Sequence, residues 1–176
     1  MGILDKDNPI FEAYRTVRTN IEFSNLDNNL KVIMVTSSQQ GEGKSIFISN
    51  LAVCFSHVKD KKILLVDCNL RKPSIHEIFE ISNTYGLMDI LTKNQEIELC
   101  TNHLCRLDII TSGDIEENPS EILTSKKMKS FIECVREEYD YIFLDTPANY
   151  ILTDAEILSV GYAATPFEQS WQDVLI

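Results

Sequence analysis

The segment Lys31 to Ser45, KVIMVTSSQQGEGKS, is the one around which this chain is organised. It begins as an apolar strand, continues as a glycine-containing loop, and ends in a Lys-Ser pair that opens an apolar helical pattern. Gly41 and Gly43 allow the backbone to approach an anion closely, and the N–H groups at the helix start would point at it. Although Ser38 replaces the first glycine of the strict pattern, this context predicts a phosphate-binding P-loop.

The P-loop interpretation assigns the nucleotide contacts to one short run. Lys44 would reach the β- and γ-phosphates, and the Ser45 hydroxyl would bind Mg²⁺. The alternative is a glycine-rich turn before an ordinary helix; the strand and helix that flank the loop favour nucleotide binding over it. The residues expected to contact the nucleotide are Gln40, Gly41, Glu42, Gly43, Lys44, Ser45 and Ile46.

Length and charge restrict the possible class of protein. The 176 residues are typical of one domain with its own core. A formal net charge of -11 argues against nucleic acid as the main partner. No apolar run approaches the length of a membrane span, and the five cysteines form no C-x-x-C pair. We therefore expect a cytoplasmic protein with reduced thiols.

Two further apolar runs end in an aspartate. Residues 63–66 are followed by Asp67 and residues 141–144 by Asp145. Ligands bind at the carboxyl ends of the strands in open α/β sheets, so both carboxylates are candidate site residues beside the P-loop. Asp145 fits a Walker B aspartate that binds Mg²⁺, whereas a lone Asp67 could equally be a helix cap. Strands alternating with helices predict a three-layer α/β fold with a mainly parallel sheet.

The N-terminal region, residues 1–30, is expected to form a helix over 9–23 and a polar turn. On that helix Glu12, Arg15 and Arg18 recur every three residues. Spacing alone favours a solvated face with an intrahelical ion pair over a subunit contact. Helical patterns are also expected at 74–79, 86–91, from 118, at 125–138 and from 153, and a strand at 107–111.

Several segments, in this order, resemble the bacterial tyrosine autokinases of capsule and exopolysaccharide synthesis. They are EAYRTVRTNI (12–21), VTSSQQGEGKS (35–45), ILLVDCNLRKP (63–73), YGLMDIL (85–91), NPSEIL (118–123) and YDYIFLDTPANYILTDA (139–155). The resemblance covers residues 12–158. It implies a P-loop kinase domain that uses ATP and Mg²⁺ to phosphorylate tyrosine between subunits.

The resemblance also implies roles for individual residues. Lys44, Asp67, Arg71 and Asp145 would be catalytic, and Ser45, Asp67 and Asp145 would hold the metal. Glu12, Arg15 and Arg18 would form an E-x-x-R-x-x-R motif that assembles a ring, which reverses the preference from spacing. The partners implied are a separate membrane-bound activator, protein tyrosine acceptors and further copies of the chain. The protein would then lie at the inner face of the membrane.

The chain departs from the family pattern at three places. Asn69 stands where the second motif usually has another aspartate, and Gln40 stands where the P-loop often has proline. Residues 160–176 form an atypical tail without the family's tyrosine cluster, so we expect a domain shortened at its C-terminus. Two alternatives therefore stay open: a nucleotide-binding paralogue without kinase activity, and an ATPase switch of the partition type.

Overall fold

A computed structural model describes residues 2–25, 30–35, 39, 41–115 and 122–147. Its helices are α1 (Phe11–Ser24), α2 (Lys44–Ser56), α3 (Ile75–Phe79), α4 (Leu87–Lys93), α5 (Ile97–Cys100) and α7 (Lys126–Glu138). Its strands are β1 (Val32–Val35), β2 (Ile63–Asp67), β3 (Thr101–Leu104), β4 (Leu107–Ile110) and β5 (Tyr141–Asp145).

The strands form one sheet in the order β1-β5-β2-β4-β3. The pairs β1–β5, β5–β2 and β2–β4 are parallel, while β3 joins β4 antiparallel at an edge. The strand of the P-loop unit, β1, forms the other edge of the described sheet. This arrangement confirms the predicted α/β fold with a mainly parallel sheet.

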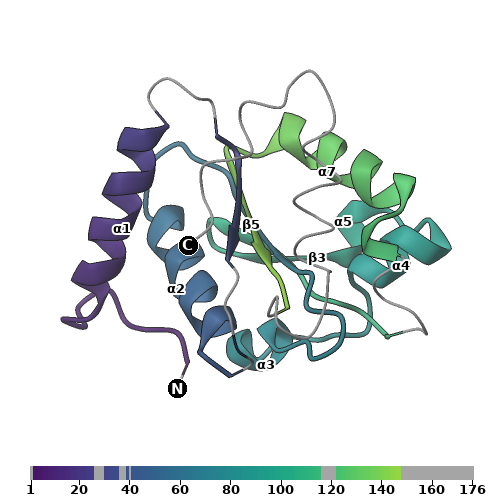
Figure 1. The fold of residues 1–176 in the computed structure, drawn as a ribbon, viewed down its shortest axis with the longest axis horizontal. Helices are drawn as coiled ribbons and strands as arrows, with labels where there is room; N and C mark the ends of the chain where they lie inside the picture. Colours follow the sequence, from purple (N-terminus) through teal and green to yellow (C-terminus); the bar gives the residue numbers. More distant parts are fainter. Residues whose placement is uncertain (1, 26–29, 36–38, 40, 116–121, 148–176) are drawn as a thin grey trace.

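Helices cover both faces of the sheet, which gives three layers (Figure 1). On one face α1 and α2 pack over a core that includes Leu51, Phe55, Leu65 and Phe143. On the other face α4 and α7 pack over a second core. All five residues of β2 and of β5 are buried because these strands are covered on both sides, as their continuous apolar runs predict.

The boundaries of most described elements agree with the sequence patterns, but α5 and β3 were not predicted. The strand β3 has the sequence TNHL and lacks the apolar run that predicted the equally short β1 and β4, and a single helical turn such as α5 shows no periodicity. The β3–β4 hairpin also turns through Cys105 and Arg106, with Cys105 at φ 55°. Asn-Gly or Asp-Gly would be the usual signal for such a turn.

Several predictions fall outside the described residues: the helices from 118 and from 153, the role of Gln40, and the tail at 160–176. Within the described residues no helix is long and apolar enough to cross a membrane. That the whole chain forms one domain stays a prediction.

Candidate functional site

The predicted site residues meet at the carboxyl edge of the sheet. Val35 pairs with Asp145, and Asp145 pairs with Asp67, so the ends of β1, β5 and β2 lie in a row. The P-loop leaves from the end of β1. The sheet register therefore places Asp67 and Asp145 next to the P-loop, although roughly eighty residues of sequence separate the two carboxylates.

The described part of the P-loop has the backbone that its glycines permit. Gly41 and Gly43 adopt φ of 88° and 85°, in the left-handed region where a side chain is strained. Gly43 is the N-cap of α2 and its carbonyl accepts a hydrogen bond from Phe47 at 2.8 Å. Lys44 and Ser45 are the first two residues of this thirteen-residue helix, and the N–H groups of a first helical turn point away from the helix, the geometry that binds phosphate.

Asp67 is buried and its carboxylate organises the loop that follows β2. One oxygen accepts a hydrogen bond from the N–H of Asn69 at 3.1 Å. The other accepts from the N–H groups of Ser74 and Ile75, each at 3.0 Å. Burial raises the pKa of Asp67, and these three donors oppose the rise. Asp67 therefore also fulfils the alternative role considered from the sequence, as a residue that holds the turn and the start of α3.

Asp145 is equally buried but has the opposite environment. Neither carboxylate oxygen has a well-formed hydrogen bond within the described residues. Burial raises the pKa of Asp145, and the neighbouring charge of Asp67 raises it further. The hydroxyl of Ser45 and the charge of Lys44 lower it, so both lie near. A buried acceptor without partners beside a serine hydroxyl and a lysine fits a divalent cation that carries phosphate.

Two hydrogen bonds that the sequence did not indicate hold the strand ends together. The hydroxyl of Thr146 donates to the carbonyl of Val35 at 2.9 Å, which fixes the end of β1, where the P-loop begins, against the end of β5. The N–H of Cys68 donates to the carbonyl of Asp145 at 2.9 Å. The sequence Asp-Thr after a buried strand was the available signal for Thr146. These bonds fix the distance between the P-loop and the two carboxylates.

The remaining predicted residues lie at the rim of this site or away from it. Glu42 is exposed, and Ile46 is half-buried in the first turn of α2. Asn69 is half-buried in the turn after β2, and the neighbouring Arg71 is exposed on the same turn. Asn69, where the chain departs from the family pattern, thus lies in the loop that Asp67 organises. The main-chain N–H of Asn69 is one of the donors to the Asp67 carboxylate.

The three charged residues of α1 have different environments. Arg15 forms an exposed ion pair with Glu12. Arg18 is less exposed and donates from Nη1 to the carbonyl of Cys54 on α2 at 2.9 Å. Arg18 therefore joins α1 to α2 within the chain, which neither a solvated face nor a purely intersubunit contact would require. The ring-forming role stays a prediction.

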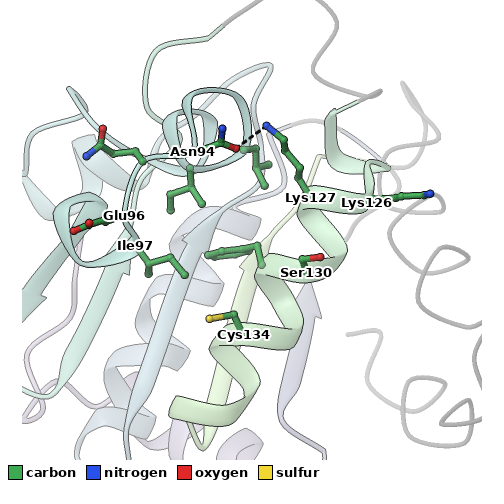
Figure 2. A pocket seen from close by; sticks show the side chains of 11 residues that line it. Asn94, Glu96, Ile97, Lys126, Lys127, Ser130 and Cys134 are labelled. Atoms are coloured by element: carbon green, nitrogen blue, oxygen red, sulfur yellow. Dashed lines mark hydrogen bonds between the residues drawn. The ribbon is translucent and has the colours of Figure 1, made fainter.

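A separate pocket of about 430 Å³ lies between the end of α4, α5 and α7 (Figure 2). Ile97, Phe131, Lys126 and Lys127 are among the residues that line it. Lys127 donates a hydrogen bond to Asn94 at 2.8 Å. None of the predicted site residues lines this pocket, so the candidate site rests on the carboxyl edge of the sheet.

Comparison with known proteins decides the family. The chain is 44% identical over 149 residues to the tyrosine-protein kinase YwqD of Bacillus subtilis, covering 84% of this chain and 62% of that protein. Its fold matches the crystal structure of the chimerical protein CapA2B2 with a TM-score of 0.83 and 34% identity, over 89% of this chain and 69% of the other. The chain belongs to the bacterial tyrosine kinases. The resemblance noted from the sequence is thereby confirmed.

Other comparisons agree with this membership. A family model described as an AAA domain matches residues 30–168. This match supports a nucleotide-binding domain of the P-loop type. The putative tyrosine-protein kinase CapB of Staphylococcus aureus is 33% identical over 84% of this chain and 65% of its own length. The kinase domain of Escherichia coli ETK matches with a TM-score of 0.83 and 30% identity, over 90% of this chain and 64% of that domain. The chain thus spans a little under two thirds of the two curated relatives.

Proposed function

We propose that this bacterial tyrosine kinase domain transfers the γ-phosphoryl group of ATP to protein tyrosines in capsular or exopolysaccharide synthesis. The observation that carries the proposal is the row formed by the P-loop, Asp145 and Asp67 at one sheet edge. A tyrosine kinase needs an ATP site and a carboxylate near the transferred group, and this row supplies both. The relatives named above as tyrosine kinases support the choice of acceptor.

The residues divide the chemistry between them. The loop N–H groups and Lys44 bind the phosphates and neutralise charge that develops on the transferred phosphoryl group. Ser45 and Asp145 would hold Mg²⁺, which would supply positive charge to neutralise the phosphates. Asp67 supports the metal and aligns or deprotonates the attacking tyrosine hydroxyl, while its hydrogen bonds keep it in place. Arg71 supplies positive charge at the rim.

Two alternatives compete with this proposal. A paralogue that binds nucleotide without transferring phosphate is motivated by Asn69, which removes one carboxylate from the loop. A partition-type ATPase is less favoured, because the solved plasmid partition protein from Borrelia burgdorferi matches at a TM-score of only 0.55 and 25% identity. Hydrolysis of ATP without any tyrosine acceptor, with no transfer to an added acceptor, would favour the ATPase.

The partners follow from the same proposal. A kinase of this type would assemble into a ring through Glu12, Arg15 and Arg18, and a membrane-bound activator would bring it to the inner face of the membrane. Protein tyrosines, including those of other copies, would be the acceptors.

Lys44→Met is expected to remove most of the affinity for ATP without unfolding the protein. Lys44 is half-exposed in the first turn of α2, so its replacement leaves the core unchanged, whereas the phosphates lose a positive charge in direct reach. Titration with a fluorescent ATP analogue should give a dissociation constant raised at least about tenfold, equivalent to ~1.4 kcal/mol. Lys59→Met, on an exposed position beyond α2, is the matched control. Equal affinity of all three proteins would refute the P-loop assignment.

Arg15→Ala is expected to shift the protein from oligomer to monomer with little change in thermal stability. On α1 the guanidinium of Arg15 forms an ion pair with the exposed Glu12. An exposed pair of this kind on a helix contributes about 0.3–0.5 kcal/mol to the free energy of unfolding. Arg18→Ala is the instructive comparison, because it also breaks the bond to Cys54 and should lower the melting temperature. Light scattering and thermal melts measure the two effects. An unchanged mass for Arg15→Ala would contradict the ring-contact role.

A further inference from the structure

Tyr85 differs from the other described tyrosines in its exposure. It is 55% exposed, whereas Tyr139 and Tyr141 are each 7% exposed. The hydroxyl of Tyr139 donates to Asp108 at 2.8 Å, and that of Tyr141 accepts from Asn25 at 3.3 Å. Tyr14 is half-buried with its ring 5.5 Å from that of Phe47. Among the described tyrosines, Tyr85 is the most exposed.

Tyr85 also lies at the edge of the sheet that carries the nucleotide site. Val66 of β2 pairs with Ile110 of β4, so the next residues, Asp67 at the end of β2 and Thr111 just after β4, lie beside each other. Neighbouring strands are about 4.8 Å apart. The hydroxyl of Thr111 donates to the carbonyl of Tyr85 at 3.2 Å. The backbone of Tyr85 is thus one strand and one hydrogen bond away from Asp67.

The turn that carries Tyr85 is held firmly on both sides. The amide of Asn83 donates to the carbonyl of Gly113 at 3.1 Å, and its oxygen accepts from the N–H of Gly113 at 3.1 Å. The N–H of Gly86 donates to the buried Asp89 at 2.9 Å. An exposed phenol on an anchored turn loses little conformational entropy when an active site takes it up.

We propose that Tyr85 is a phosphorylation site for the chain's own kinase activity. The inference rests on the proposed function and names one acceptor for it. The Tyr85 oxygen forms a bond to the γ-phosphorus of ATP, the bond from that phosphorus to the β–γ bridging oxygen breaks, and ADP leaves. The phenolic proton is released to solvent. The products are phosphotyrosine, ADP and one proton for each ATP consumed.

The experiment measures phosphorylation of the intact chain and of a separate acceptor in the same reaction. The protein is incubated with ATP and Mg²⁺ together with a random copolymer of glutamate and tyrosine, and phosphopeptides are sequenced by mass spectrometry. The segment between Arg71 and Lys93 contains Tyr85 and no other tyrosine, so its phosphotyrosine is unambiguous. We expect phosphate on Tyr85 at least about tenfold above that on Tyr14, Tyr139 or Tyr141.

Variants separate this site from the kinase activity itself. Tyr85→Phe should lose phosphotyrosine from the 71–93 segment and still phosphorylate the copolymer, and Tyr14→Phe is the matched control that should keep both. Copolymer phosphorylation with an unmodified Tyr85 would overturn the inference and leave the proposed function standing. Absence of phosphate from the copolymer and from every tyrosine would overturn both.

Discussion

Asp145→Asn is expected to abolish the binding of Mg²⁺-nucleotide while making the nucleotide-free protein more stable. The two carboxyl oxygens are buried and have no hydrogen-bond partner among the described residues, so ionising this group costs the fold free energy. The raised pKa of Asp145 predicts that the substitution stabilises the protein. It means that the folded protein disfavours the ionised carboxylate even with Lys44 and Ser45 nearby. A neutral amide of the same shape cannot ionise and therefore removes that cost, while its polar atoms stay as buried as those of the carboxyl group.

The stability gain should depend on pH in a defined direction. A carboxyl with a raised pKa binds its proton more tightly in the folded than in the unfolded chain, so the wild-type protein loses stability as pH rises from the usual aspartate value, about 3.9, through the raised one. Asp145→Asn removes this loss. Urea unfolding of the nucleotide-free proteins should therefore give curves that separate as pH rises. A variant less stable than wild type at pH 8 would contradict the argument.

Asp67→Asn is the matched control in the same site. Its carboxylate accepts bonds from Asn69, Ser74 and Ile75, and an amide nitrogen in place of one oxygen would face a donor. An N–H group left unpaired in a buried loop costs about 1–3 kcal/mol. We expect Asp67→Asn to lower the melting temperature, where Asp145→Asn raises it. Shifts of the same sign and size would show that the two environments do not differ as described.

Gly86→Ala is expected to destabilise the fold more than any other substitution considered. A Cβ on Gly86 would lie 2.7 Å from the carbonyl carbon of Ser112 and closer still to Gly113 N and Thr111 O. All three are backbone atoms that cannot rotate away. Moving them apart would break the bonds from Leu87 to Thr111 and from Met88 to Ser112, of 2.8 and 2.9 Å. Overpacking and two lost bonds together cost roughly 3–5 kcal/mol, a large part of a typical stability.

The measurement for Gly86→Ala is the urea midpoint, with Gly2→Ala as control. Nothing lies within 4 Å of a Cβ at Gly2, so the control should unfold like the wild type. A midpoint for Gly86→Ala within error of the control would mean that the junction between residues 86 and 113 is looser than this structure has it. The Tyr85 turn depends on the same junction.

Local sequence patterns were enough to predict the layout of the fold and the chemistry of its central motif. Continuous apolar runs predicted β1, β2 and β5 because strands covered on both faces need no polar side. The glycines and the Lys-Ser pair predicted the P-loop because positive φ and free helix N–H groups are local properties. The aspartates that follow two strands were found because parallel strands end at one edge. Each of these signals lies within a few neighbouring residues.

Residues that look alike in the sequence have different environments in the folded chain. Asp67 and Asp145 both follow a buried strand, yet one accepts three backbone bonds and the other has no well-formed bond among the described residues. Arg15 and Arg18 repeat one spacing, yet only Arg18 reaches the carbonyl of Cys54, thirty-six positions away. Gly86 is irreplaceable because Gly113 lies against it. These differences arise from burial and from partners distant in the chain, and local sequence patterns encode neither.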